Sequence, residues 1–246
     1  MLTIKRARMA AASAGLVAIV GFTACGESRY SCGDNERDCS TLDHGCGTAQ
    51  CVKGVCEIDF VNDDQRCSLT NTSGGSGGGP YLETCPDGQI LIGVEASEAS
   101  GYWNGALSHL QGLCGELVAS EDGVAVEERA PLVPRSVIGT YGPVYKDSPK
   151  RVACGPDEVL VGVDGAVDTL EGTAALSLLA INCAALVVDD TGDFTFGDTV
   201  RRAGSIGSSI SEPTENLCTG GQIARGFYGR FGAILDSFGV VCRDVP

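Results

Sequence analysis

Residues 85–94 read CPDGQILIGV, and the same pattern returns as CGPDEVLVGV at 154–163 and as CTGGQIARGF at 218–227. Each copy begins with a cysteine, which is followed by a β-branched residue five positions later and a glycine eight positions later. Each copy ends on a second cysteine, with a leucine seven positions before it. The glycines are Gly93, Gly162 and Gly226, and the leucines are Leu107, Leu176 and Leu235. Agreement at fixed offsets in three copies indicates an internal threefold repeat.

The spacing of the cysteines predicts how each copy folds. The two cysteines are 29 residues apart in the first and second copies and 24 apart in the third. Apolar residues alternate on both sides of a glycine-rich middle, which predicts two antiparallel strands with turns near Ser100, Asp168 and Arg230. Cysteines that face each other across such a strand pair can form a disulfide. The predicted disulfides are Cys85–Cys114, Cys154–Cys183 and Cys218–Cys242.

Extended segments with glycines precede the hairpins. They lie at 74–79, 136–142 and 204–207. Each copy therefore holds about four strands, and no helical periodicity runs long enough to predict a helix. Three sheets of this size can enclose one core, so we expect an all-β domain over residues 80–246.

Residues 222–241, QIARGFYGRFGAILDSFGVV, resemble the C-terminal repeat of jacalin-type lectins. The matching positions are Gly226, Phe227, Gly229, Arg230, Gly232, Asp236, Gly239 and Val240. The paired cysteines and the ending ALSHLQGLC at 106–114 are similar to the vitelline membrane outer layer protein. Both families form a β-prism of three Greek-key sheets with pseudo-threefold symmetry. The resemblance, which covers residues 74–246, implies this fold here.

The lectin resemblance also implies a carbohydrate site between a glycine loop and a Gly-x-x-x-Asp loop. The matching residues are Gly78, Gly79, Gly232, Ala233, Ile234, Leu235 and Asp236. A carboxylate accepts charge-assisted hydrogen bonds from sugar hydroxyls. Ser108 and Ser177 stand at the Asp236 position in the other copies, so one site at most is expected. The structural alternative is that Asp236 only caps backbone N–H groups beside a turn.

The first hairpin loop carries two adjacent aromatic residues, Tyr102 and Trp103. An exposed aromatic pair can stack on the face of a sugar, whereas packing in the core is the commoner fate of such residues. The sequence leaves both alternatives open.

No catalytic motif is present in the sequence. His109 lies in a predicted strand without a nucleophile or carboxylate placed to work with it. His44 and His109 are the only histidines and have no zinc-like spacing, so we expect neither a metal nor a cofactor. The expected function is non-enzymatic binding of glycans or cell-surface polysaccharide. The alternative is a structural or adhesion module of the cell envelope with no sugar site.

The N-terminus reads as an export signal. Lys5, Arg6 and Arg8 precede an apolar run at 9–23 that is too short to span a bilayer. Residues 22–25, FTAC, resemble the lipobox of bacterial lipoproteins, although Phe22 replaces the usual leucine. We therefore expect residues 1–24 to be a lipoprotein signal peptide and Cys25 to be lipidated. The protein would be exported and lipid-anchored in the cell envelope, at the outer membrane or surface, on the periplasmic or extracellular face. An ordinary cleaved signal with a chance cysteine is the alternative.

Residues 25–67 are dense in cysteine and form a predicted small disulfide module. Of the 13 cysteines, 12 remain for pairing once Cys25 carries lipid, which suits an oxidising compartment. Cys32, Cys39, Cys46, Cys51, Cys56 and Cys67 would form three disulfides among themselves. Many aspartates in this module could hold calcium or simply form a solvated acidic surface.

Residues 68–79 are rich in Ser and Gly and are expected to form a flexible linker, unless their glycines belong to the next domain. The net charge of −15 falls to −18 once the three basic residues of the signal are removed. Such a charge disfavours nucleic acid as a partner.

Overall fold

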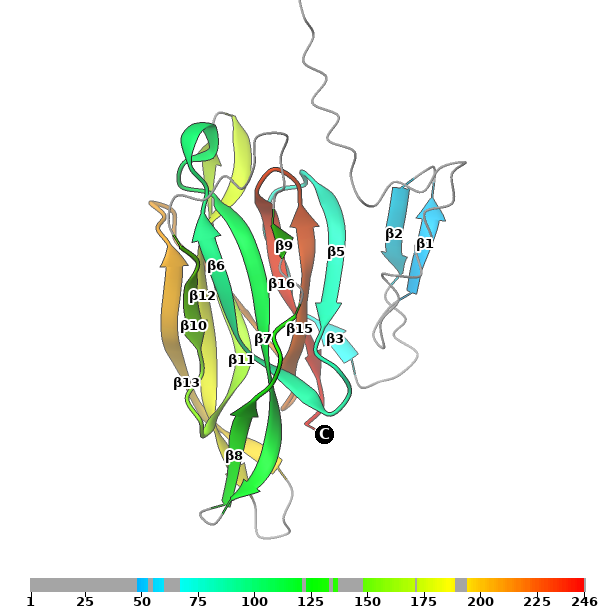
Figure 1. The fold of residues 1–246 in the computed structure, drawn as a ribbon, viewed down its shortest axis with the longest axis vertical. Coiled ribbons are helices and arrows are strands. Elements are labelled where there is room, and N and C mark those ends of the chain that lie inside the picture. Colours follow the sequence, from blue (N-terminus) through cyan, green and yellow to red (C-terminus); the bar gives the residue numbers. More distant parts are fainter. Residues whose placement is uncertain are drawn as a thin grey trace, which may run out of the picture.

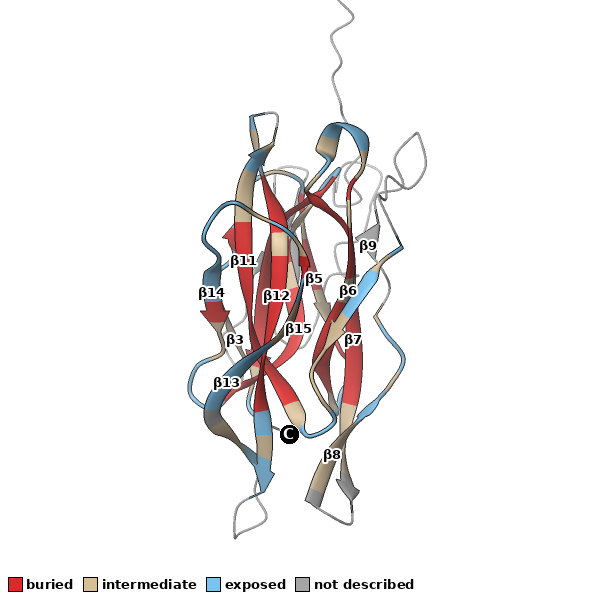
Figure 2. Cartoon of the chain, turned by 90° about the vertical axis from the view of Figure 1, so that its left-hand side faces the viewer, coloured by how far each residue is buried: buried red, intermediate tan, exposed pale blue. Residues whose placement is uncertain are grey.

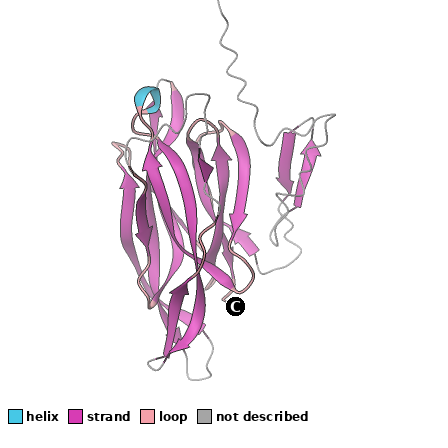
Figure 3. Cartoon of the chain, in the orientation of Figure 1, coloured by secondary structure: helices cyan, strands magenta, loops and turns pink. Residues whose placement is uncertain are grey.

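The computed structural model describes residues 48–52, 55–59, 67–120, 123–132, 135–136, 148–170, 172–188 and 194–245. Strands dominate these residues, and the one helical element among them is the short 3-10 helix η2 (Gly101–Trp103) (Figure 3). The described part contains no helix of the length and apolarity needed to cross a membrane. The predicted signal peptide and the lipidation of Cys25 lie outside the described residues.

Three long hairpins form the body of the molecule (Figure 1). They are β6 (Gln89–Glu98) with β7 (Leu107–Ser120), β11 (Glu158–Leu170) with β12 (Thr173–Val188), and β15 (Ile223–Phe231) with β16 (Leu235–Arg243). The first strand of each carries a register shift just before its repeat glycine, between Leu91 and Gly93, Leu160 and Gly162, and Ala224 and Gly226. The predicted threefold repeat is therefore visible in the register of the strands.

Each hairpin is flanked by a strand that belongs, in sequence, to the next copy. β10 (Lys150–Ala153) precedes β11 but pairs with β6, and β14 (Thr214–Leu217) precedes β15 but pairs with β11. The ring closes because β5 (Gly79–Thr84), which precedes β6, pairs with β15. Every copy thus completes the sheet of its neighbour, and the chain cannot form one sheet without the others.

The repeat glycines exist because these flanking strands approach closely. A Cβ at Gly93 would lie 2.4 Å from the Val152 carbonyl oxygen of β10. At Gly226 the corresponding distance to the Glu83 oxygen of β5 would be 2.1 Å. Backbone atoms cannot yield as a flexible side chain can, so only glycine fits.

Outer strands complete the three sheets. β8 (Gly123–Glu128) and β9 (Arg135–Ser136) pair with β7, β13 (Phe194–Gly207) pairs with β12, and β3 (Cys67–Leu69) and β4 (Ser73–Gly74) pair with β16. All the pairings are antiparallel. The predicted fold class, a β-prism of three sheets, is confirmed. Of the segment predicted at 136–142, only Ser136 is described.

One core lies between the sheets. Its largest fully buried side chains include Tyr81, Phe227 and Phe238, with the rings of Phe227 and Phe238 stacked at 5.6 Å. Figure 2 shows buried residues gathered along β7, β11 and β12. Each of the three sheets contributes aliphatic residues to this cluster, among them Leu110, Leu179 and Val240.

The three predicted disulfides are present, but their geometry differs from the prediction. Cys85, Cys154 and Cys218 lie at the ends of the flanking strands, and their amides donate to carbonyls of the preceding sheet. Each disulfide therefore joins two neighbouring sheets, because the second cysteine lies on the second strand of the next hairpin. The predicted turn at Ser100 does lie between β6 and β7, whereas the other two predicted turn positions shift for the same reason. Asp168 and Arg230 lie within strands, opposite Ala175 and Ser237.

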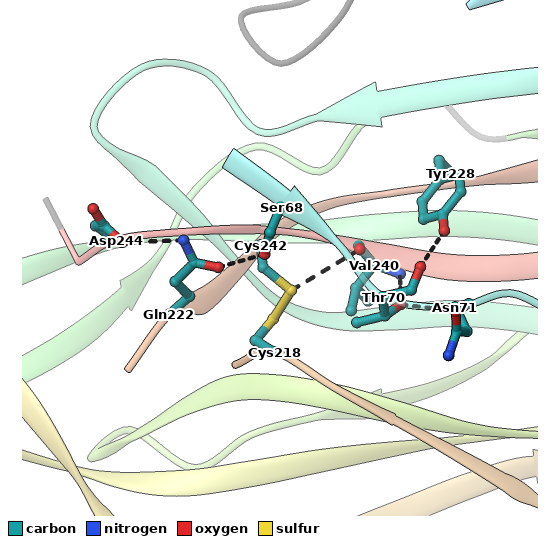
Figure 4. The surroundings of a disulfide bond; sticks show 9 residues. All are labelled: Ser68, Thr70, Asn71, Cys218, Gln222, Tyr228, Val240, Cys242 and Asp244. Atoms are coloured by element: carbon teal, nitrogen blue, oxygen red, sulfur yellow. Dashed lines mark hydrogen bonds between the residues drawn. A yellow bond between two sulfur atoms is a disulfide. The ribbon is translucent and has the colours of Figure 1, made fainter. Parts of the chain in front are cut away.

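The predicted linker at 68–79 is instead part of the third sheet, so its glycines do belong to the prism. The Thr70 amide donates to the Val240 carbonyl at 3.1 Å, and the Tyr228 hydroxyl donates to the Thr70 carbonyl (Figure 4). Ser68 hydrogen-bonds Gln222, whose amide donates to Asp244 at 3.1 Å. Burial of the backbone against β16 makes this segment structured despite its composition.

A separate two-stranded sheet, β1 (Thr48–Val52) with β2 (Val55–Asp59), lies within the cysteine-rich region. Cys67 is disulfide-bonded. That residues 32–67 hold three disulfides among themselves stays a prediction, because Cys32, Cys39 and Cys46 lie outside the described residues.

Candidate functional site

The glycine loop of residues 75–78 arches over the tip of the third hairpin. Gly74 in β4 lies opposite Ser237, and Gly79 in β5 lies opposite Phe231, so the loop between these strands must cross the turn at 232–234. The Gly75 amide donates to the Asp236 carbonyl at 2.7 Å. Segments more than 150 residues apart in the chain therefore form one surface at this end of the prism (Figure 1).

The carboxylate of Asp236 lies directly beneath this loop. A Cβ at Gly77 would lie 2.3 Å from Asp236 Oδ1, and one at Gly78 would lie 2.5 Å from Oδ2. Gly78 also has a φ of +60°, a left-handed conformation that favours glycine. A Cβ at Gly232 would lie 3.2 Å from Oδ2. Glycine at these positions lets backbone, rather than side chains, enclose the carboxylate.

Arg230 holds the loop in place. Its Nε donates to the Gly77 carbonyl and its Nη2 to the Gly78 carbonyl, both at 2.7 Å. The C=O and N–H of a trans peptide point in opposite directions, so the N–H groups of Gly78 and Gly79 point away from the guanidinium. One side chain thereby fixes the orientation of two peptide units above the carboxylate.

Asp236 is buried without a full set of hydrogen bonds. Only 4% of the residue is exposed, and its Oδ2 has no hydrogen-bond partner among the described residues. The Gly232 amide is nearby but donates to the Ile234 carbonyl at 2.9 Å. Burial raises the pKa of Asp236 to about 6, against the opposing effects of the Arg230 charge and the Gly232 amide. A buried carboxylate oxygen without a donor is unfavourable by about 1–3 kcal/mol or more, so it needs an explanation.

The structure brings together some of the predicted site residues and separates others. Gly78, Gly232 and Asp236 meet at the carboxylate, but Gly79 is buried in β5 and Gly77 takes its place. Ala233 is exposed at the turn. Ile234 and Leu235 are buried, so their side chains face the interior. That Gly79 lines the site stays a prediction, since Gly79 is buried at the start of β5, opposite Phe231.

Sequence reasoning missed the role of Arg230. It belongs to the run of residues that resembles the lectins, but nothing in the run indicates that its target is a loop 152 and 153 residues away. No group of three or more His, Cys, Asp or Glu side chains placed to hold a metal occurs in the described ranges.

The second hairpin has an equivalent tip with different chemistry. The Ser208 amide donates to the Ser177 carbonyl at 3.0 Å, as the Gly75 amide donates to Asp236. The loop that follows carries hydroxyls, and Ser209 and Ser211 each donate to Asp168 Oδ1 at 2.8 Å. Burial acts to raise the pKa of Asp168, but these hydrogen bonds outweigh it and lower the pKa.

The aromatic pair of the first hairpin lies at the same end of the molecule. Trp103 is partly buried and packs against a small cluster at the hairpin tips. Tyr102 is 66% exposed, and its ring meets that of Trp103 edge-on at 4.9 Å. Of the two alternatives for this pair, Trp103 therefore packs against buried residues and Tyr102 is exposed.

Several solved lectins are similar to the chain in fold. The agglutinin of Calystegia sepium is 16% identical over 73% of this chain and 97% of its own, with a TM-score of 0.48. The mannose-binding lectin from champedak is 18% identical over 72% and 97%, with a TM-score of 0.45. Single-chain recombinant jacalin is 14% identical over 72% and 95%, with a TM-score of 0.44.

The likeness is in fold alone. The predicted resemblance to jacalin-type lectins holds at that level. No protein-family model matches the sequence, and no curated protein matches it. A function for this chain must therefore rest on its own residues.

Proposed function

We propose that the prism binds carbohydrate at one site, formed by the loop at 75–78 and the residues at 232–236. The observation that carries the proposal is the buried Asp236 carboxylate, whose Oδ2 lacks a hydrogen-bond donor within the described chain. Sugar hydroxyls are donors of the right size, and two neighbouring hydroxyls can bind one carboxylate. A sugar hydroxyl would donate the hydrogen bond that Asp236 Oδ2 lacks within the described chain.

Backbone groups complete the recognition. The Gly78 N–H points away from Arg230, so it can donate to an oxygen of the same sugar. Because Oδ2 is covered by Gly78 and Gly232, the loop must shift outward for a hydroxyl to reach it. Two or three hydrogen bonds to a charged group, each worth about 1.5–3 kcal/mol, support a millimolar to micromolar affinity, about −4 to −8 kcal/mol.

Binding without catalysis suits this arrangement. Hydrolysis of a glycosidic bond needs two carboxyl groups on either side of that bond. Arg230 is the only charged side chain among the described residues that shifts the pKa of Asp236. The site therefore offers an acceptor and an ordered backbone, but no acid–base pair.

The test compares Asp236→Asn with Asp168→Asn as its matched control. Asparagine keeps the shape of the side chain and removes the charge. On a glycan array and by calorimetry, Asp236→Asn should lose binding while Asp168→Asn binds like the wild type. A wild-type protein that binds no glycan, or an Asp236→Asn variant that binds equally well, contradicts the proposal. That result would favour the structural or adhesion module.

We further propose that the protein is exported and held at the cell envelope by lipid on Cys25. The basic residues, the apolar run and the FTAC sequence support this assignment. Cys25→Ser should release soluble protein or leave the precursor uncleaved, as fractionation and mass spectrometry would show. A Cys25→Ser protein that is processed and stays in the membrane fraction would mean another anchor.

A further inference from the structure

Resting on the proposed function, we infer that the Asp236 site continues onto the tip of the first hairpin, where Tyr102 stacks on a second sugar ring. The ligand class is then a neutral oligosaccharide of at least two pyranose units. Its first ring is held by hydrogen bonds at Asp236, and its second ring places an apolar C–H face on the tyrosine.

A continuous layer of packed side chains connects the two places. Ala99 and Ala106 from the first hairpin, Ala175 from the second and Ile234 from the third form one buried cluster at the tips. Trp103 packs against this cluster, and its ring contacts that of Tyr102 at 90°, with the ring centroids 4.9 Å apart. Ile234 ends the turn at 232–234 and lies two residues before Asp236, which is in β16. The aromatic pair and the carboxylate therefore share one support, and Figure 1 shows both tips at the same end of the prism.

The tip that carries Tyr102 is a closed turn. Ala99 and Ala106 are joined by a backbone hydrogen bond of 2.7 Å, and the Ala106 amide closes on the Trp103 carbonyl at 3.0 Å. Gly101 and Gly105 have φ values of +67° and +98°, although a Cβ at either would meet nothing within 4 Å. Glycine is thus required there by the shape of the turn and not by packing. A ring held on such a turn loses little freedom when a ligand binds.

The exposure of Tyr102 fits a sugar better than a protein partner. It is the one aromatic among the large apolar side chains exposed in the described part of the chain. Its neighbours Gly101 and Asn104 are exposed and small or polar. A stable protein interface buries roughly 800 Å² on each partner, far more than one ring provides. A single aromatic ring beside an amide matches the area and polarity of one pyranose.

The test uses the methyl glycosides of glucose, galactose and mannose beside the disaccharides cellobiose, lactose and mannobiose. For the sugar that the wild type binds, we expect the disaccharide to bind about tenfold more tightly than the methyl glycoside. In Tyr102→Ala that advantage should fall to about twofold or less, while affinity for the methyl glycoside stays unchanged. Tyr102→Phe, which keeps the ring, should retain the advantage, and thermal melts of all three proteins should coincide.

The outcomes separate the two proposals. Methyl glycoside binding that is lost in Asp236→Asn, with no disaccharide advantage in the wild type, overturns the extension alone. An advantage that persists in Tyr102→Ala also overturns it. A wild-type protein that binds none of these sugars overturns the proposed function and the extension together.

Discussion

The tips of the second and third hairpins are built alike, but only the second supplies hydrogen bonds to its carboxylate from the loop. In each, a loop follows an outer strand, β13 or β4, and its amide donates to a carbonyl on the second strand of the hairpin, Ser208 to Ser177 and Gly75 to Asp236. In the second tip the loop carries hydroxyls that satisfy Asp168. In the third tip the loop has only glycine against the carboxylate, and Asp236 Oδ2 is left without a donor. A carboxylate satisfied internally is structural, whereas one that the backbone encloses without donating to it lacks a hydrogen bond that a ligand can supply once the loop shifts outward.

The strongest way to break this comparison is to add a side chain to the glycine loop. In Gly78→Ala the new Cβ would fill the space beside Asp236 Oδ2 and meet the backbone of Phe231, so a sugar hydroxyl has no room next to the carboxylate. We expect sugar affinity to fall by about 100-fold or more. Calorimetric titration measures this.

Gly88→Ala is the control for that substitution. Gly88 also has a positive φ, of +80°, but its Cβ would meet nothing within 4 Å. It should therefore suffer the conformational cost of about 1 kcal/mol without any change in binding. Equal losses of binding in the two variants would show that backbone strain, and not access to the carboxylate, controls affinity.

Stability should respond with opposite signs at the two tips. Asp236→Asn removes a buried charge without a full set of partners and should stabilise the fold by about 1–3 kcal/mol at pH 8. Asp168→Asn weakens two charge-assisted hydrogen bonds at a partly exposed site and should destabilise it by about 1 kcal/mol. Chemical denaturation of the two variants and the wild type decides the point. Destabilisation by Asp236→Asn would assign Asp236 a structural role.

The pH dependence sharpens the contrast. Because the folded-state pKa of Asp236 is raised to about 6, its contribution to stability is present at low pH and lost as pH rises from about 4 to about 6. Sugar binding needs the ionised form, so affinity at pH 5 should be about tenfold lower than at pH 7. Asp168, with a lowered pKa, stabilises the fold at neutral pH and loses that effect only in stronger acid. Flat affinity between pH 5 and 7 would contradict this account.

The smallest effect is expected from Arg230→Lys. Lysine keeps the charge but cannot donate to the Gly77 and Gly78 carbonyls from two nitrogens of one rigid fork. Affinity should fall about threefold to tenfold through a looser loop, with the pKa of Asp236 little changed. A drop as large as that of Gly78→Ala would mean that Arg230 contacts the sugar itself.

Much of the fold is predictable from the sequence because the repeat obeys local rules. The offsets of Gly93, Gly162 and Gly226 mark the register shift in each hairpin, and the cysteine spacing identifies the correct disulfide partners. No sequence pattern indicates that each flanking strand pairs with the hairpin of the preceding copy. Cysteine spacing therefore predicts links across hairpins where the structure has links between sheets.

The site is predictable only in part, for a related reason. Asp236 and Gly232 belong to one short motif, so the family resemblance finds them. Whether Asp236 has hydrogen-bond donors depends on the loop at 75–78, which comes from the N-terminal side of the domain in sequence. The composition of that loop predicts a linker. Gly77 and Arg230 gain their roles only when strand pairing brings that loop onto the third hairpin.

The pKa of Asp236 in the free and sugar-saturated protein tests the central claim most directly. Carbon-13 NMR titration of the aspartate carboxyl groups, with Asp236→Asn to assign the signal, gives both values. We expect a pKa of about 6 in the free protein and a clear fall when sugar supplies the missing hydrogen bonds. A pKa within the ordinary aspartate range that sugar does not move would show that the protein already satisfies this carboxylate by itself.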